Sequence, residues 1–404
     1  MAASKTARAA NVTIAASAVL FLAGCGGGGS SASAGGSTAA PPASNLSAAA
    51  ALGEQIFNDV SLSASGAQAC STCHNPNNAH AQVNDLAVQL GGTNLDQHGF
   101  RAVPSLNYLG STPNASLDAQ GHPVGGFDLD GRAATLLAQP ALPFTASFEM
   151  ANGDNAAVIA RLSKAAYAAQ FQQVFGAGIF NDPDTAFADV SDALQQYQLE
   201  DPSFHAYSSK YDLYLAGKAS LSTAEANGLA LFKDPAKGNC HACHISTPDA
   251  SGNAPDFTNH GYAVIGVPRN AAIPANTSAT YFDLGVCGPY RTDLSARQDL
   301  CGAFKVPSLR NVATRKVFFH NGRFSDLTTA VSFLIERDTN PGLWYPTVSG
   351  AIVKFDDLPV ANRGNVDTTD MPFSRQPGMA PALSPAEIAD LVQFLNTLTD
   401  GYTN

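Results

Sequence analysis

The chain has 404 residues and a mass of 41.7 kDa, which is enough for two domains of ordinary size and excludes a small protein held together by disulfides. Charged residues make up 14% of the chain and apolar residues 45%, with 35 glycines and 24 prolines, a composition typical of a loop-rich globular protein. The net charge of −11 at pH 7 argues against nucleic-acid binding and favours a basic protein partner.

Residues 1–25 have the pattern of a secretion signal. Lys5 and Arg8 precede an apolar run over residues 12–22, which is too short to span a bilayer as a stable helix. The run ends at the sequence Leu-Ala-Gly-Cys25, and small residues before a cysteine resemble the lipobox of bacterial lipoproteins, in which Cys25 carries the lipid. The alternative is an ordinary signal peptide beside a free thiol.

Residues 26–46 are almost entirely Gly, Ser, Ala, Thr and Pro. Such a segment cannot bury enough apolar surface to fold, because its side chains are too small and too polar. We therefore expect a flexible tether between a membrane anchor and the folded protein.

Two copies of the pattern C-x-x-C-H follow, far apart in the chain. This pattern is typical of c-type haem attachment, in which two thioethers hold the porphyrin edge and the adjacent imidazole binds the iron. A zinc site built from two C-x-x-C pairs and a thioredoxin-like redox pair are the alternatives, but two copies that both carry the histidine favour two haems. The residues are Cys70, Cys73 and His74 in the first copy and Cys240, Cys243 and His244 in the second.

An internal duplication surrounds the two copies. The template A-x-G-x-x-[IL]-F-x-D precedes each copy, and two further segments recur downstream in the same order, which predicts tandem haem domains. The matching pairs are residues 51–59 with 226–234, residues 100–106 with 304–309, and residues 131–136 with 322–327.

The expected fold class is all-α, with two tandem cytochrome c-like haem domains and long irregular loops. Apolar residues at helical spacing predict helices over residues 155–175 and 185–200. The pattern Ser-x-x-Glu at Ser222 and at Ser384 predicts the start of two more helices. The irregular segments, residues 75–130 and 245–300, are expected to wrap the haems.

We place the first haem domain at residues 47–216 and the second at residues 217–404, with the boundary near residues 215–222. The remaining cysteines, Cys287 and Cys301, are 14 residues apart in the second domain. In an oxidising compartment they are predicted to form a disulfide that closes a loop near the second haem.

In combination, these residues resemble the bacterial di-haem cytochrome c peroxidases and their relative MauG, over about residues 48–400. The resemblance rests on both haem patterns, on Asp-Gly-Arg at residues 130–132, on F-K-V-P-S-L-R-N at residues 304–311 and on F-H-N-G at residues 319–322. It implies a calcium ion between two helical domains, a first haem that meets hydrogen peroxide, and a second haem that receives electrons from a small cytochrome c or cupredoxin. It also implies a lipid-anchored protein at the periplasmic face of a bacterial envelope membrane, and it leaves monomer and homodimer open.

The resemblance also assigns roles to single residues. Gln139 and Glu149, ten residues apart, match the glutamine and glutamate of the peroxide pocket in the family. Peroxide cleavage needs a group that moves a proton from the inner to the outer oxygen, and Glu149 is the candidate. An exposed carboxylate at a helix start is the alternative for Glu149. Asn107 matches a calcium ligand, with a turn asparagine as the alternative.

Two positions depart from the family pattern. Leu129 stands where relatives have a tryptophan between the haems, and Leu334, 14 residues after His320, stands where relatives have the Met or Tyr that binds the second iron. Tyr345, Met371 and Met379 are the nearest replacements able to bind iron, and each has packing as its alternative role. We take Met379 as the candidate ligand.

A distal ligand of the first haem is the last expectation. His98 is nearer the family position and is the candidate, whereas His80 is expected to be a surface histidine. Three functions remain open: a di-haem peroxidase, a MauG-like oxidase that acts on another substrate, and an electron-transfer protein. Retention of the Gln139 and Glu149 pair favours an enzyme over an electron-transfer protein. The leucines at positions 129 and 334 favour the peroxidase over the MauG-like oxidase.

Overall fold

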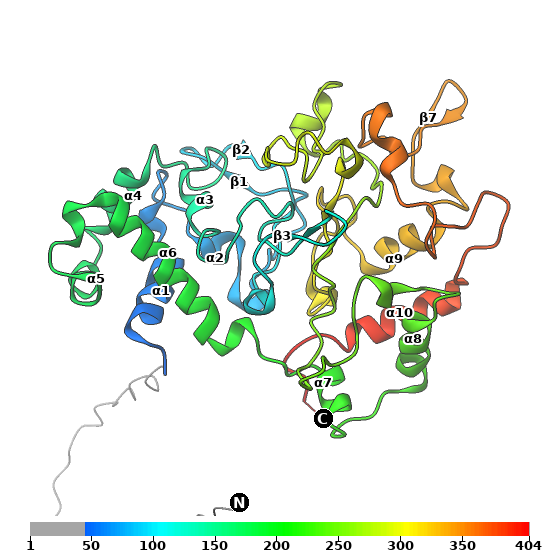
Figure 1. The fold of residues 1–404 in the computed structure, drawn as a ribbon, viewed down its shortest axis with the longest axis horizontal. Coiled ribbons are helices and arrows are strands. Elements are labelled where there is room, and N and C mark those ends of the chain that lie inside the picture. The colour runs from blue at the N-terminus through cyan, green and yellow to red at the C-terminus, as the bar shows by residue number, and fades with distance from the viewer. Residues whose placement is uncertain (1–44, 404) are drawn as a thin grey trace, which may run out of the picture. The chain divides into compact units, whose positions relative to one another are not determined.

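The structure is a computed structural model that describes residues 45–403 (Figure 1), so the predicted signal sequence, Cys25 and most of the tether lie outside it. The α-helices are α1 (Ala48–Asn58), α2 (Cys70–Cys73), α3 (Ala141–Thr145), α4 (Asn155–Leu162), α5 (Ala168–Phe175), α6 (Pro183–Glu200), α7 (Lys210–Leu215), α8 (Thr223–Lys233), α9 (Leu327–Glu336) and α10 (Pro385–Asn396). The strands are β1 (Leu90–Gly91), β2 (Gln97–His98), β3 (Ser116–Leu117), β4 (Pro123–Val124), β5 (Tyr262–Ala263), β6 (Phe304–Lys305), β7 (Thr347–Val348) and β8 (Ala351–Ile352).

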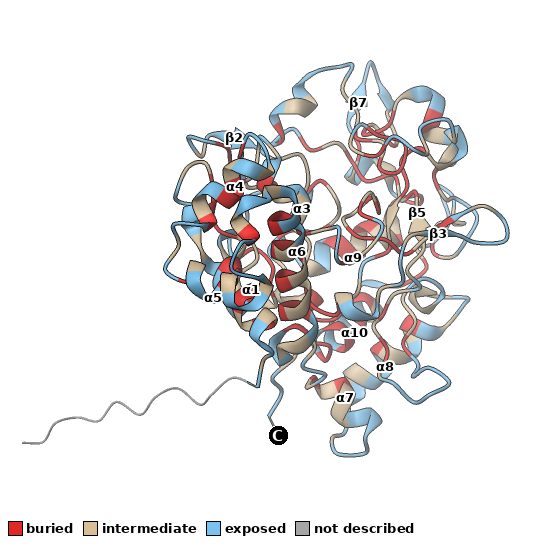
Figure 2. Cartoon of the chain, turned by 60° about the vertical axis from the view of Figure 1, so that its left-hand side comes forward, coloured by how far each residue is buried: buried red, intermediate tan, exposed pale blue. Residues whose placement is uncertain are grey.

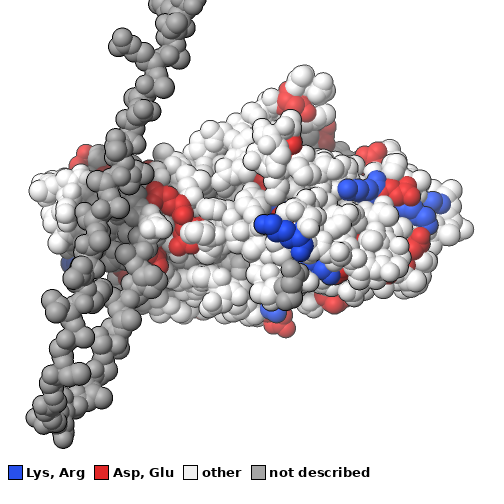
Figure 3. Space-filling model, turned by 90° about the horizontal axis from the view of Figure 1, so that it is seen from below, with Lys and Arg blue, Asp and Glu red and all other residues white. Residues whose placement is uncertain are grey.

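The fold class is helix-rich rather than all-α. The strands form four antiparallel pairs of two residues each, β1 with β2, β3 with β4, β5 with β6 and β7 with β8. The pairs from β1 to β6 lie within or beside the two long irregular segments, and β7 and β8 follow α9. Within residues 45–403, none of the helices combines the length and the apolar character that crossing a membrane requires. Charged side chains are sparse on the face shown in Figure 3, and both signs occur there.

Helices α1 and α6 form the core of the first half. Ser47 caps α1 by accepting a hydrogen bond from the amide of Ala50, and the apolar side of the helix then packs on α6 (Figure 2). The two helices cross at Gly53, where a Cβ atom would lie 2.0 Å from the carbonyl oxygen of Ala193. Only a glycine permits this close approach.

Helices α8 and α10 repeat this arrangement in the second half. Both begin at the predicted Ser-x-x-Glu capping boxes, in which Ser222 and Ser384 form reciprocal hydrogen bonds with the glutamates three residues later. Gly228 of α8 lies against the carbonyl oxygen of Asp390 in α10, and an added Cβ atom would be 2.1 Å from that oxygen. The duplication in the sequence is therefore a duplication of helix packing.

Replacing Gly53 by alanine is expected to destabilise the protein by about 1–3 kcal/mol, because the new Cβ atom would overlap the backbone of α6. This loss would outweigh the higher helix propensity of alanine. Gly153→Ala is the matched control, since a Cβ atom there meets no atom within 4 Å. Guanidinium unfolding of both variants measures the difference, and equal midpoints would contradict the close helix crossing.

The two halves contact each other through reciprocal hydrogen bonds. The amide of Ala102 donates to the carbonyl of His320, and the amide of Lys305 donates to the carbonyl of Leu129, both at 2.8 Å. Ala102 and Lys305 occupy matching positions in one pair of duplicated segments, and Leu129 and His320 each lie two residues before the segments of another pair. The contact is thus pseudo-symmetric, and residues 45–403 belong to one compact unit.

Helix α7 packs with the second half, and the boundary near residues 215–222 stays a prediction. Tyr211 of α7 belongs to the core of the second half, and its amide donates to the carbonyl of Thr397 after α10. The predicted helix over residues 155–175 is also two helices, α4 and α5, because the chain turns between Leu162 and Ala168.

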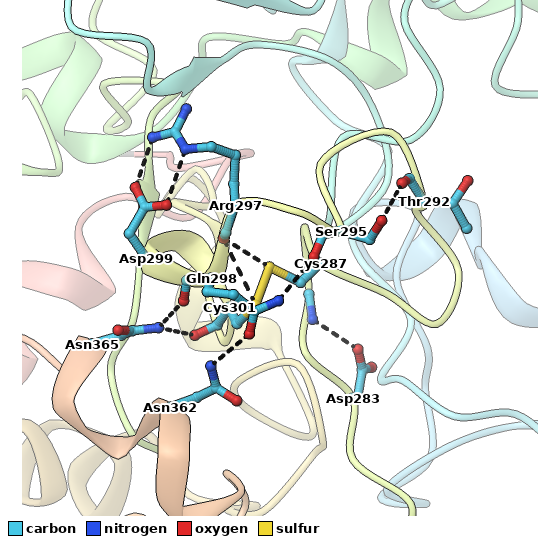
Figure 4. Close-up of a disulfide and its surroundings, with 11 residues drawn as sticks. Asp283, Cys287, Thr292, Ser295, Arg297, Gln298, Asp299, Cys301, Asn362 and Asn365 are labelled. Atoms are coloured by element: carbon cyan, nitrogen blue, oxygen red, sulfur yellow. Dashed lines mark hydrogen bonds and ion pairs between the residues drawn. A yellow bond between two sulfur atoms is a disulfide. The ribbon is translucent and has the colours of Figure 1, made fainter.

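The structure pairs Cys287 with Cys301 (Figure 4). The carbonyl of Cys301 accepts a hydrogen bond from Asn365, and the amide of Gly285 donates to Asp283 at the start of the loop. Asp283 also forms a buried ion pair of 2.6 Å with Arg101 of the first half. The disulfide therefore closes a loop that is tied to both halves of the molecule.

Candidate functional site

The first site is a cavity of about 180 Å³ in the first half. Helix α2 supplies Cys70 and Cys73, both with free thiols, and His74 follows the helix directly. The Nδ1 atom of His74 donates to the carbonyl of His80 at 3.1 Å, which leaves Nε2 for a metal ion. Burial lowers the pKa of His74 to about 4, so its imidazole is neutral and able to bind a metal.

The second site is a cavity of about 400 Å³ in the second half. Cys240, Cys243 and His244 line it, and both thiols are free. The Nδ1 atom of His244 donates to the carbonyl of Phe257 at 2.9 Å, again leaving Nε2 for a metal ion. Arg315 also lines this cavity and forms no ion pair within residues 45–403. Its planar guanidinium suits a haem propionate.

Each cavity thus provides two free thiols, a histidine oriented by a backbone carbonyl, and largely apolar walls. These features fit a covalently attached haem, with the thiols forming the thioethers and Nε2 binding the iron. The fold and the two sites define a di-haem c-type cytochrome. The first cavity differs from the second in that Glu149 lines it.

Glu149 and Gln139 lie in the same cavity as His74, as the sequence predicted for a peroxide pocket. They flank helix α3, which brings the two side chains to one wall. The segment that carries Glu149 is held against β1: the amide of Gly92 donates to the carbonyl of Glu149, and a Cβ atom on Gly91 would lie 2.9 Å from its Cα atom. Burial, together with the charge of Asp128, raises the pKa of Glu149 to about 7.

Asp128 is a pocket residue that the sequence analysis missed. Its side chain is 12% exposed, and it lines both cavities. Its Oδ1 atom accepts a hydrogen bond of 3.3 Å from Gln139, and its Oδ2 atom lies 3.4 Å from the Nε atom of Arg132 without a hydrogen bond. Burial raises the pKa of Asp128. In the duplication, Asp128 matches Phe319 of the second half.

Leu129 lies between the two cavities and lines both. The chain thus has an aliphatic side chain at this junction. Trp344 packs instead on Phe324 and Phe333 in the second half. Beside Leu129, the ammonium of Lys305 donates to the carbonyl of Gly126, and burial lowers its pKa to about 8.

The structure corrects three expectations about ligands. His80 is fully buried and stacks on Phe204 at 3.7 Å between ring centroids, so it is not a surface histidine. His98 lies in β2 as an exposed residue that does not line the first cavity. Met379 is 53% exposed and does not line the second cavity, so neither His98 nor Met379 lies at the cavity for which it was predicted.

Two other candidates are occupied by contacts within the chain. The Oδ1 atom of Asn107 lies 2.8 Å from Nδ1 of His80, so a calcium ion at Asn107 stays a prediction. Tyr345 is buried, and its hydroxyl donates to the carbonyl of Gly266, which is the expected packing role. Met371 does line the second cavity.

Comparisons with known proteins agree with this description. The sequence model of the family described as di-haem cytochrome c peroxidase matches residues 47–220. The methylamine utilization protein MauG of Paracoccus denitrificans (strain Pd 1222) is 34% identical over 367 residues, which cover 87% of this chain and 89% of that protein. The cytochrome c551 peroxidase of Nitrosomonas europaea is 28% identical over 70% of this chain and 71% of that protein.

Among solved structures, the dihaem peroxidase BthA of Burkholderia thailandensis E264 has a TM-score of 0.80 and 37% sequence identity, and the match covers 87% of this chain and 86% of that chain. The chain therefore belongs to the family of di-haem cytochrome c peroxidases and MauG. It is an oxidoreductase of that family.

Proposed function

We propose that the protein reduces hydrogen peroxide to two molecules of water, using two electrons from a small electron-donor protein, a cytochrome c or a cupredoxin, and two protons. The observation that carries this proposal is the placement of Glu149 and Gln139 in the same cavity as His74. Haem attached at Cys70 and Cys73 supplies the redox chemistry. Cys240, Cys243 and His244 would hold a haem at the second site, and a haem there would accept electrons one at a time.

The residues of the first cavity have the chemistry that peroxide cleavage requires. The carboxylate of Glu149 accepts the proton of the inner peroxide oxygen and returns it to the outer oxygen, which leaves as water. A pKa of about 7 suits both steps, because the group gains and loses a proton at similar cost near neutral pH. Gln139, held by Asp128, offers its amide to orient the peroxide.

A MauG-like oxidase is the second candidate, and the 34% identity to MauG over most of the chain favours it. Such an enzyme withdraws electrons from a bound protein or small-molecule substrate instead of a diffusing donor. Leu129 argues against it, because a leucine at the junction of the cavities provides no aromatic side chain to share the oxidation between the two haems.

The location of the protein at the periplasmic face of an envelope membrane, with a lipid on Cys25, is part of the proposal. It is supported by the secretion pattern of residues 1–25 and by the Cys287–Cys301 pair, since disulfides persist in oxidising compartments. The net charge of −11 favours a basic donor, whose oxidation would slow as salt is added.

Peroxide-dependent oxidation of a reduced cytochrome c by the haem-loaded protein tests the proposal. We expect two molecules of donor to be oxidised for each peroxide consumed, measured by donor absorbance together with the remaining peroxide. Omission of peroxide is the control, because a carrier would exchange electrons without it. Spectral changes with peroxide but no oxidation of the donor would reject the peroxidase and favour the oxidase.

A further inference from the structure

The two cavities are built from matching segments of the duplication. An isolated β-bridge joins Phe127 to Ala133 in the first half, and a second bridge joins Phe318 to Phe324 in the second half. Asp128 follows Phe127, and Phe319 follows Phe318. Both residues have a left-handed backbone, with φ of 64° at Asp128 and 66° at Phe319. These matching positions allow the wall of one cavity to be compared with the wall of the other, residue by residue.

The segment that carries Gln139 in the first half matches α9 in the second half, and α9 forms one wall of the second cavity. Gln139 lies as far along the chain from Asp128 as Ala330 lies from Phe319. Gln139 lines both cavities, and Ala330 lines the second. At the four matched positions, the second cavity has an apolar side chain wherever the first cavity has a polar one. The pairs are Asp128 with Phe319, Gln139 with Ala330, Pro140 with Val331 and Pro143 with Leu334.

The α9 wall of the second cavity therefore offers no side chain that binds iron and none that moves a proton. Ala330, Val331 and Leu334 carry only aliphatic atoms, and the neighbouring Ile335 does as well. The apolar environment favours a neutral ligand over a charged one, because a charge loses its hydration there without gaining a partner.

Side chains elsewhere in the cavity that are able to bind iron lie with the haem-attachment segment or are engaged. The carbonyl of Met371 accepts a hydrogen bond from Asn239, next to Cys240, and its sulfur accepts one from Ser374. The amide of Asn259 donates to the carbonyl of Cys243, which places His260 in the segment that also orients His244.

His320 also lines the cavity but is held by two contacts. Its ring stacks on Phe304 with a centroid distance of 3.8 Å, and its Nε2 atom lies 3.3 Å from a carboxylate oxygen of Asp357. These contacts fix the ring at the junction of the two halves, where its backbone carbonyl binds Ala102.

We propose that His244 is the only side chain bound to the iron of the second haem, and that the space beside Ala330, Val331 and Leu334 is a binding site for a small neutral diatomic ligand such as carbon monoxide or nitric oxide. The α9 wall differs from the peroxide pocket in carrying no proton donor or acceptor. It binds a ligand reversibly and does not cleave one. This property is independent of peroxide reduction, so failure of either proposal leaves the other standing.

Carbon monoxide is the probe, added to the dithionite-reduced, haem-loaded protein and counted per chain from the absorbance change. Leu334→Met places a thioether in the α9 wall with little change of volume, and its sulfur would occupy the open position. We expect this variant to bind one carbon monoxide fewer per chain than the unaltered protein. The control is Leu383→Met, at a buried leucine that does not line the cavity.

Met371→Leu tests the main rival ligand, because this change removes the thioether nearest the attachment segment. The proposal expects the same number of carbon monoxide molecules per chain in Met371→Leu as in the unaltered protein. A gain of one would show that Met371 binds the iron and would overturn the proposal. Equal counts in Leu334→Met and the unaltered protein would also overturn it, since the open position would then not lie beside α9.

Discussion

Glu149→Gln is expected to lower the rate of peroxide reduction by about 10²–10⁴-fold, because glutamine keeps the shape of the side chain but cannot accept or return a proton. Both haems should remain attached, since Glu149 contributes no ligand and no thioether. The measurement is the rate at which the oxidised protein reacts with peroxide, followed by stopped-flow absorbance, with the haem content of each sample determined separately.

The matched control is Glu54→Gln, which makes the same chemical change at an exposed position of α1. We expect the control to react with peroxide at the rate of the unaltered protein. A Glu149→Gln variant that reacts equally fast would remove Glu149 from the mechanism. The proton would then have to move through Asp128 or through water.

Asp128→Asn is expected to move the pH dependence of the peroxide reaction to lower pH. The ionised form of Glu149 accepts the proton, so the rate should rise with pH through the pKa of Glu149, about 7. Burial is the larger cause of this raised pKa, and the negative charge of Asp128 adds to it. Removing that charge stabilises the ionised form of Glu149, so below pH about 7 the variant should react faster than the unaltered protein.

Asparagine still accepts the hydrogen bond from Gln139, so the geometry of the pocket is retained while the charge is lost. The rate constant is measured between pH about 5 and about 9 for both proteins. An unchanged midpoint would mean that Asp128 does not act on Glu149. A midpoint that rises would mean that Asp128, rather than Glu149, is the base.

The haem attachments and the duplication could be predicted from local sequence. The C-x-x-C-H pattern needs only five neighbouring residues, and the cysteines and histidine of each copy line a cavity. The capping boxes at Ser222 and Ser384 are equally local, and both helices begin where they indicate. Gly53 and Gly228 occupy matching positions because each half contains the same close crossing of two helices.

Residues whose role depends on distant partners could not be predicted in this way. His80 is buried because it stacks on Phe204, and Asp128 is a pocket residue because the left-handed turn at this position directs it toward Gln139. His98 is in the expected stretch of sequence but lies on the outer strand β2, away from the cavity. Nothing in the neighbouring residues of any of the three indicates these contacts.

The sequence by itself determined two haem attachments and a helix-rich duplicated chain, because these depend on short spacings and residue types. The resemblance to the family then singled out Gln139, Glu149 and Leu334. Only the tertiary structure decided that the halves form one unit, that Asp128 and Leu129 line both cavities, and that α9 is an aliphatic wall. The physical reason is that burial, and with it the pKa of Glu149, is set by residues that are far apart in the chain and meet only after folding.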